Sequence, residues 1–442
     1  MGFKNLLLQS VFWRSCSFFT SFVLNLCIAR FFGPALSGEL NLLIALLAFF
    51  LILSGLNLDA AIIYFSAGNR ISLNRMAGIS AASIFFGILS VFFLPFFIKE
   101  GNLLFEQQLQ LYFFAGVYMA GMQLSNLSTA FFYGKKNFNI PGLLISLTNL
   151  ALIIILFIVI SGGFEHLFSY YLRFFFILPL LQGITLAIWL KVKYMPSFHF
   201  DFPAKEEIKK IFRFSIIVFL ANLLLFLMYR IDYWMLAELD HSKDRINDLG
   251  NYIQISKIGQ VFIVVSSAIG SAVFSNTSAR GFTEKKSLHN LCRTIRMIVL
   301  AGFILYLFFF LIGKPVMLFF YGWQYDSVYP CGLLLIPGII FLMTVSVTAN
   351  YLSGSGYTRI NLIGAMTSLT VILLGDYFLI PYRGIYAAAF VSTIGYLLYA
   401  IYMLANFRKI INCKWKEILL FQNNDLAYLK EFLSGIIKNI FK

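Results

Sequence analysis

Apolar residues occur in long blocks along this chain. About a dozen such segments fill residues 8 to 407, with short polar stretches between them. A helix needs about 20 apolar residues to cross ~30 Å of hydrocarbon. The pattern therefore predicts about twelve membrane-spanning helices, at 8–31, 38–66, 77–98, 109–133, 140–161, 167–190, 212–238, 250–279, 291–312, 330–353, 359–381 and 384–407.

Composition supports an all-α polytopic membrane protein. Hydrophobic residues make up 60% of the chain and charged residues 12%, too few charges for a water-exposed surface. The net charge is +15. Nucleic-acid-binding proteins concentrate basic residues in a folded polar domain, and the sequence predicts no such domain. The basic residues therefore indicate the orientation of the chain in the membrane. Most of the 34 Lys and Arg residues fall in alternate loops and the tail, which places these loops and both termini in the cytoplasm. The first apolar segment exceeds a signal-peptide core, so we expect a retained helix.

The spans divide into two sets of equal number. We predict an N-terminal six-helix bundle at 1–190, a cytoplasmic linker at 191–211, a C-terminal six-helix bundle at 212–407 and a cytoplasmic amphipathic tail at 408–442. The ends of the fourth and tenth spans, 129–134 and 348–354, resemble each other, either by chance or because the halves are a repeat with the substrate site between them. Apolar residues at helical spacing over 426–440 predict a surface helix that anchors the tail or docks a polymerase or glycosyltransferase.

Polar stripes and charges within the spans supply the candidate site. Arg14 and Asn25 share one face of the first span with several serines, Asn222 lies in the seventh, and Gln254 in the eighth. Such stripes pack against a neighbouring helix or line a hydrated interior. The ionisable residues within or at the ends of the spans are Arg30, Asp59, Arg173, Arg230, Asp232, Lys257 and Asp376.

A charge at the centre of a membrane helix costs about 2.5–3.5 kcal/mol, so we expect most of these groups to face a shared interior. Arginine pairs bidentately with phosphate oxygens and lysine acts as a point charge, so an interior rich in both suits a diphosphate. The alternatives are ion pairs that hold helices together, such as Arg230 or Lys257 with Asp232 or Asp376, and an interfacial role for Arg30. The scattered cysteines and histidines predict no metal site, disulfide or cofactor.

Three stretches resemble the polysaccharide flippases of the MOP superfamily (Wzx type). They are Ala29–Leu40 with its Gly-Pro turn, Ser54–Ala61 with its Gly-Leu pair, and Leu379–Ala389 with Ile-Pro followed by Gly-Ile and small residues. Gly375–Asp376 departs from the pattern, because many members carry an asparagine there. The resemblance implies two six-helix bundles of MOP/MATE-like fold around a central cavity.

The resemblance also implies a function. A flippase of this type moves a polyprenyl-diphosphate-linked oligosaccharide (undecaprenyl diphosphate type), such as an O-antigen or capsule repeat unit for lipopolysaccharide biosynthesis, from the inner to the outer leaflet of the bacterial cytoplasmic (inner) membrane. Alternating access, coupled to H⁺ or Na⁺, is the expected mechanism. The predicted substrate-binding residues are Arg30, Arg173, Arg230, Lys257, Arg14, Asn25, Asn222 and Gln254; the predicted ion-coupling residues are Asp59, Asp232 and Asp376.

Two rivals remain. A MATE-like multidrug or metabolite cation antiporter would favour a net acidic interior, whereas this one has excess positive charge. A membrane polysaccharide polymerase or glycosyltransferase would need a large outer loop with catalytic carboxylates, and the outer loops here are short. We therefore predict a transporter rather than an enzyme, with membrane lipids as its surroundings.

Overall fold

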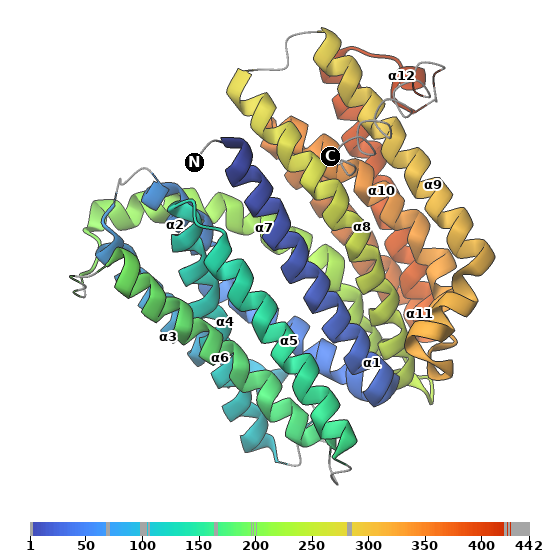
Figure 1. The fold of residues 1–442 in the computed structure, drawn as a ribbon. Coiled ribbons are helices and arrows are strands. Elements are labelled where there is room, and N and C mark those ends of the chain that lie inside the picture. The colour runs from blue at the N-terminus through green and yellow to red at the C-terminus, as the bar shows by residue number, and fades with distance from the viewer. Residues whose placement is uncertain are drawn as a thin grey trace, which may run out of the picture. The chain divides into compact units, whose positions relative to one another are not determined.

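The computed structural model describes residues 3–67, 71–97, 104, 107–162, 167–195, 197, 199, 201–280, 285–419, 422 and 425, and all regular structure among them is helical (Figure 1). The helices are α1 (Phe3–Gly55), α2 (Leu58–Ala67), α3 (Leu73–Leu89), η1 (Ser90–Phe96), α4 (Gln108–Gly134), α5 (Asn139–Ser161), α6 (Leu167–Tyr194), α7 (Lys205–Leu239), α8 (Arg245–Arg280), α9 (Lys285–Tyr321), η2 (Trp323–Tyr325), α10 (Val328–Gly354), α11 (Thr358–Ile411) and α12 (Trp415–Leu419). They form two compact units, Met1–Phe226 and Leu227–Lys442.

The described helices account for the predicted membrane spans. Nine of them are long and apolar enough to cross a membrane. Two of these, α1 and α11, each contain two predicted spans, because the backbone leaves the helical conformation at Gly33 (φ 75°) and Gly384 (φ 50°). Glycine adopts positive φ without a steric penalty, so each break falls at a glycine. With α4, which covers the predicted span 109–133, the fold class of about twelve helices is confirmed.

The second predicted span differs from the expectation. A continuous helix over 38–66 is wrong, because α1 ends at Gly55 and α2 begins at Leu58. Leu56 and Asn57 between them have φ values of 44° and 56°. Positive φ is uncommon outside glycine, and the apolar segments on both sides of this pair led the prediction to treat 38–66 as one helix.

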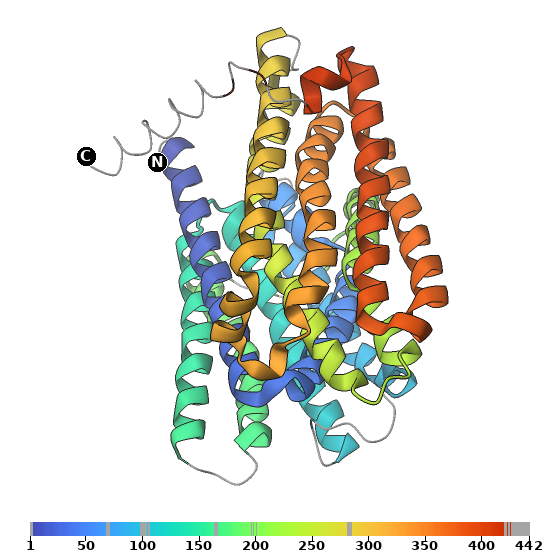
Figure 2. The same cartoon turned by 90° about the vertical axis from the view of Figure 1, so that its right-hand side faces the viewer.

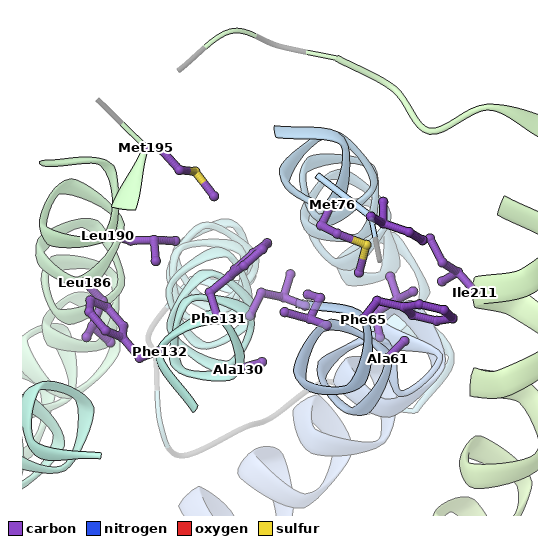
Figure 3. Packing of buried hydrophobic residues seen from close by; sticks show 14 of the residues in the cluster. Ala61, Phe65, Met76, Ala130, Phe131, Phe132, Leu186, Leu190, Met195 and Ile211 are labelled. Carbon is purple, nitrogen blue, oxygen red and sulfur yellow. The ribbon is translucent and has the colours of Figure 1, made fainter. Parts of the chain in front are cut away.

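In the N-terminal unit, α4 is the central helix and packs against α6, α2 and α3. An apolar cluster at one end of this unit includes Phe65 of α2, Met76 of α3, Phe131 of α4, Leu190 of α6 and Ile211 of α7 (Figure 3). Because loops and helix ends from five helices meet there, burial of these side chains fixes the start of α7 to the N-terminal unit.

Ion pairs reinforce this attachment. Nε of Arg75 lies 2.9 Å from Oδ2 of Asp201, and its Nη1 lies 3.0 Å from Oε1 of Glu207. The backbone N–H of Ala204 donates to Oε2 of Glu207 at 2.9 Å, which caps the first turn of α7. One arginine of α3 therefore holds the segment that leads into α7. The linker boundaries at 191 and 211 remain a prediction.

In the C-terminal unit, α10 takes the central position and packs against α8, α11 and α9 (Figure 2). It resembles α4 in how it ends. After α4, the N–H groups of residues 135, 136 and 137 donate to the carbonyls of 131, 133 and 132; after α10, those of 355, 356 and 357 donate to 351, 353 and 352. Lys136 and Gly356 have positive φ in these turns. Such an ending is found in roughly a third to a half of helices, so the repeat that the sequence suggested remains a prediction.

The segment after α11 turns back onto α9. Asn412 ends α11 in the left-handed conformation, and α12 then packs against α9. Arg293 and Arg296 of α9 both bind the carboxylate of Asp425. The amphipathic helix predicted over 426–440 lies outside the described residues.

Candidate functional site

Serines of the polar stripe in the first span take part in helix packing. Ser17 Oγ donates to the carbonyl of Gly142 at 3.3 Å, and Asn149 Nδ2 donates to Ser21 Oγ at 2.9 Å. These bonds join α1 to α5, which run side by side (Figure 1). Small polar residues let membrane helices approach closely and bond across the contact. Of the two interpretations of this stripe, the structure shows packing for these serines.

The predicted cations of the N-terminal unit are exposed. The guanidinium of Arg14 lies 5.6 Å from the ring centroid of Tyr133, and that of Arg173 lies 5.3 Å from that of Tyr170. Arg30 is exposed three residues before the break at Gly33. Arginine stacked on an aromatic face keeps its charge and most of its donors available. These groups can still meet an anion.

The remaining predicted residues of the N-terminal unit have polar neighbours. Asn25 is half-buried and accepts a hydrogen bond from Asn41 Nδ2 at 3.4 Å. Asn222 of α7 is exposed and donates to Asn57 Oδ1 at 2.8 Å, next to the break between α1 and α2. Asp59 is exposed in the first turn of α2, where a carboxylate is favoured by the helix dipole.

Arg230 of α7 is a predicted cation of the C-terminal unit that contacts two neutral polar groups. Its Nη1 donates to the hydroxyl of Tyr233, its Nη2 donates to Gln260 Oε1 of α8 at 3.0 Å, and its guanidinium lies 4.9 Å from the Tyr233 ring centroid. Within the described part of the chain, its hydrogen bonds go to neutral groups and not to a carboxylate. The predicted alternative of a direct ion pair with Asp232 or Asp376 is therefore not formed by this arginine.

Asp232 lies two residues further along α7, and only 1% of its surface is exposed. Its Oδ1 accepts the backbone N–H of Tyr233 at 3.0 Å. Its Oδ2 accepts the hydroxyl of Tyr252 and, at 3.5 Å, that of Ser392. These donors stabilise negative charge on the carboxylate.

Asp376 of α11 is a second buried carboxyl, within electrostatic range of Asp232. Both of its oxygens are buried and have no hydrogen-bond partner among the described residues. A buried polar group without a partner costs about 1–3 kcal/mol, so this carboxyl is suited to take up a proton or a metal cation.

Lys257 and Gln254 of α8 complete the predicted set in this unit. Lys257 is half-buried and close enough to Arg230 for the two charges to interact. Gln254 is fully buried. The structure thus places four of the predicted charges, on α7, α8 and α11, in one electrostatic neighbourhood.

Sequence reasoning missed three participants: Tyr233, Tyr252 and Ser392. Each is buried and directly linked to Arg230 or Asp232. A tyrosine inside an apolar span needs a partner for its hydroxyl, which is the signal that could have marked both tyrosines. No spacing rule would have found Ser392, because it comes from α11, 160 positions after Asp232.

The fold matches solved structures over nearly its whole length. A multidrug resistance MATE family transporter of the MOP superfamily, facing inward, has a TM-score of 0.70 and 15% identity, covering 90% of this chain and 94% of that one. The lipid II flippase MurJ, in an inward closed conformation, has a TM-score of 0.70 and 16% identity, covering 98% and 96%. A MOP superfamily transporter from Pyrococcus furiosus has a TM-score of 0.63 and 18% identity, covering 92% and 96%.

These TM-scores, over at least 90% of each chain, establish the fold, which is that of multi-pass membrane transporters of the MOP superfamily. No curated protein matches the chain in sequence. A family model described as polysaccharide biosynthesis protein matches residues 7–282, more than half of the chain. The chain belongs to this family, and the resemblance to the polysaccharide flippases of the MOP superfamily is confirmed.

Proposed function

We propose that this protein is a flippase for a polyprenyl-diphosphate-linked oligosaccharide, such as an O-antigen or capsule repeat unit. It moves the lipid-linked sugar from the inner to the outer leaflet of a bacterial cytoplasmic membrane by alternating access, with both termini in the cytoplasm. Membership of the polysaccharide biosynthesis family supports this proposal, and a lipid II flippase shares the fold.

The observation that carries the proposal is the environment of Arg230. Its guanidinium is held by a phenol and an amide, with Lys257 nearby. Asp232, two residues along α7, supplies counter-charge to Arg230 without accepting a hydrogen bond from it, so the donors of the guanidinium bind only these neutral groups among the described residues. Neutral hydrogen-bond partners can be exchanged for phosphate oxygens without separating an ion pair. A diphosphate, with its several oxygens, suits a guanidinium and an ammonium together.

The driving force in this proposal is a proton or sodium ion at Asp232 and Asp376. The carboxyl without a partner lies within electrostatic range of one that is hydrogen-bonded. A cation shared between them would satisfy the oxygens of Asp376. Asp59 remains a predicted coupling residue, and Arg14, Arg30, Arg173, Asn25, Asn222 and Gln254 remain predicted contacts for the substrate head group.

The leaflet that the substrate occupies tests this function directly. Cells lacking the protein, rescued with the full chain or left unrescued, are labelled for lipid-linked oligosaccharide in each leaflet. We expect accumulation on the inner leaflet without the protein and normal distribution with it. An unchanged distribution in the deletion strain, with loss of drug efflux instead, would contradict the proposal and support a MATE-like antiporter, whose fold is equally similar.

Variants of the cation pair locate the site. Arg230→Ala and Lys257→Ala should each impair rescue at normal protein level, and Arg230→Lys should rescue better than Arg230→Ala because it keeps the charge. Lys243→Ala, which removes an exposed loop cation, is the matched control and should rescue fully. Full activity of the Arg230→Ala, Lys257→Ala double variant would remove both residues from the mechanism.

A further inference from the structure

Two buried tyrosines connect the charges of opposite sign on α7. Arg230 donates to the hydroxyl of Tyr233, and Tyr252 of α8 donates its hydroxyl to Oδ2 of Asp232. The two rings meet edge to face, with centroids 6.0 Å apart and an interplanar angle of 89°. A continuous path of contacts thus runs from the guanidinium to the carboxylate through two aromatic rings.

The path is enclosed by protein. Neither ring is exposed, and the Tyr233 hydroxyl also hydrogen-bonds to Ser256 of α8. Side chains in an interior packed to crystal-like density move only when their neighbours move. A displacement of the Tyr252 ring therefore requires the Tyr233 ring to move as well, and the Tyr233 hydroxyl is hydrogen-bonded to Arg230.

The carboxylate end of the path is where a cation would compete. Oδ1 of Asp232 is held by a backbone N–H, whereas Oδ2 accepts two side-chain hydroxyls, from Tyr252 and Ser392. Asp376, with no hydrogen-bond partner among the described residues, offers the second carboxyl. A cation that binds both carboxyls through Oδ2 of Asp232 would compete with the Tyr252 hydroxyl for that oxygen.

We propose that Tyr252 is a positioning residue that couples occupancy of the carboxyl pair to anion binding at Arg230, by way of the Tyr233 ring. This inference rests on the proposed function, which assigns a diphosphate to Arg230 and a cation to Asp232. A cation that weakens the Tyr252–Asp232 bond frees the ring pair and releases Arg230 toward the diphosphate. Linkage is reciprocal, so bound diphosphate strengthens cation binding by the same factor.

A simpler route must be separated from this one. Asp232 and Arg230 also interact directly through their charges, so a cation that neutralises the carboxylate would favour an anion without any tyrosine. Direct attraction does not depend on the Tyr252 hydroxyl. Removing that hydroxyl while keeping the ring, with Tyr252→Phe, therefore distinguishes the two routes.

The experiment measures binding of undecaprenyl diphosphate to the purified full-length protein in nanodiscs. Sodium is titrated at constant pH in one series, and pH is titrated without sodium in the other, which separates the two cations. The coupling factor is the ratio of the Kd values at low and high cation. For the wild type we expect a ratio within the roughly 5- to 150-fold range of allosteric couplings. For Tyr252→Phe we expect a ratio below about half the wild-type value, because the low-cation Kd should fall toward the high-cation Kd once the bond to Asp232 is absent.

Tyr399→Phe is the matched control, because it removes the hydroxyl of another buried tyrosine of this unit, bonded to Asn361 instead. It should keep the wild-type ratio. Tyr233→Phe breaks the other end of the path and should lower the ratio as Tyr252→Phe does. It also provides the test if Tyr252→Phe fails to fold. The double variant should lose no more coupling than either single variant, because both cut one path.

The possible outcomes distinguish a failure of the tyrosine path from a failure of the proposed flippase function. A wild-type ratio retained in the folded tyrosine variants overturns the path and leaves the flippase proposal standing. Equal loss of coupling in Tyr399→Phe also overturns it, because any buried hydroxyl would then have the same effect. Absence of diphosphate binding by the wild type at every cation level would overturn both.

Discussion

Arg296 and Asp425, 129 positions apart in the chain, form an ion pair with 2.7 Å between Nε and Oδ2. Both side chains are buried, and Nη2 of the arginine makes a second bond to Oδ1 at 2.9 Å. Arg293 binds Oδ1 from the next turn of α9 at 3.1 Å. One carboxylate thus fastens the segment after α12 to α9.

Removing that carboxylate should destabilise the C-terminal unit. Asp425→Asn leaves a buried guanidinium without its counter-charge, and breaking one side of a buried pair costs about 3–5 kcal/mol. Arg293→Gln should cost less, because Arg293 is partly exposed and its loss leaves the Arg296 pair intact. Apparent melting temperatures in detergent test this order, and equal melting of the wild type and Asp425→Asn would contradict it.

The same pair predicts a pH dependence. The hydrogen bond from Arg296 holds the pKa of Asp425 below its ordinary value. An acid with a depressed folded-state pKa stabilises the fold fully above its unfolded pKa of about 3.9. That contribution is lost as the pH falls through the lower, folded-state pKa. The difference in melting temperature between the wild type and Asp425→Asn should stay constant from neutral pH to about 5 and shrink toward pH 3. A difference that grows on acidification would refute this assignment.

Close contact between α4 and α6 predicts a glycine requirement. A Cβ at Gly121 would lie 2.3 Å from the backbone nitrogen of Leu180 and 2.6 Å from the carbonyl carbon of Pro179. Backbone atoms cannot rotate away, so Gly121→Ala should cost about 1–3 kcal/mol, as overpacking does. Gly116 on the same helix has no atom within 4 Å of its Cβ position. Gly116→Ala should be neutral or stabilising by up to about 1 kcal/mol, and equal thermal stability of the two variants would argue against the contact.

The bonds between α1 and α5 predict a modest effect. Asn149 donates to Ser21 Oγ at 2.9 Å and to Thr20 Oγ1 at 3.1 Å. Interhelical hydrogen bonds in membranes contribute about 0.6 kcal/mol each on average, so Asn149→Leu should cost about 1 kcal/mol. Ser161→Ala, which removes a hydroxyl whose bonds to described residues lie within α5, is the control. Unfolding in mixed micelles measures both variants, and a cost for Ser161→Ala as large as for Asn149→Leu would count against the contact.

Much of the fold could be predicted because membrane helices are specified by length and hydropathy. The breaks at Gly33 and Gly384 were also visible, since each glycine lies beside a proline-containing turn that resembles the MOP family. The break at Leu56 and Asn57 was not visible, because asparagine is enriched at positive φ but leucine is not, and a single asparagine inside a predicted span did not mark a break. The stripe containing Ser17 was ambiguous, since a serine that packs against α5 and one that lines a cavity have the same spacing.

The candidate site was only partly predictable for a similar reason. The free-energy cost of a charged side chain in hydrocarbon identified Arg230, Asp232 and Asp376 as residues that should face the protein interior. Hydropathy does not say what each charge contacts, so the preference of Arg230 for Tyr233 and Gln260 over a carboxylate required three-dimensional information. Partners contributed by distant helices leave no local pattern in the sequence.

The seam between α1 and α5 joins positions 125 to 132 residues apart. The ribosome therefore delivers the first helix well before its partner exists. Until α5 is inserted, Ser17 and Ser21 lack the partners on α5 that they have in the folded protein, and hydrocarbon supplies no hydrogen-bond partner. We expect the nascent α1 to stay beside the translocon or an insertase through much of synthesis. The contact between α1 and α5 would then determine when α1 is released into the bilayer.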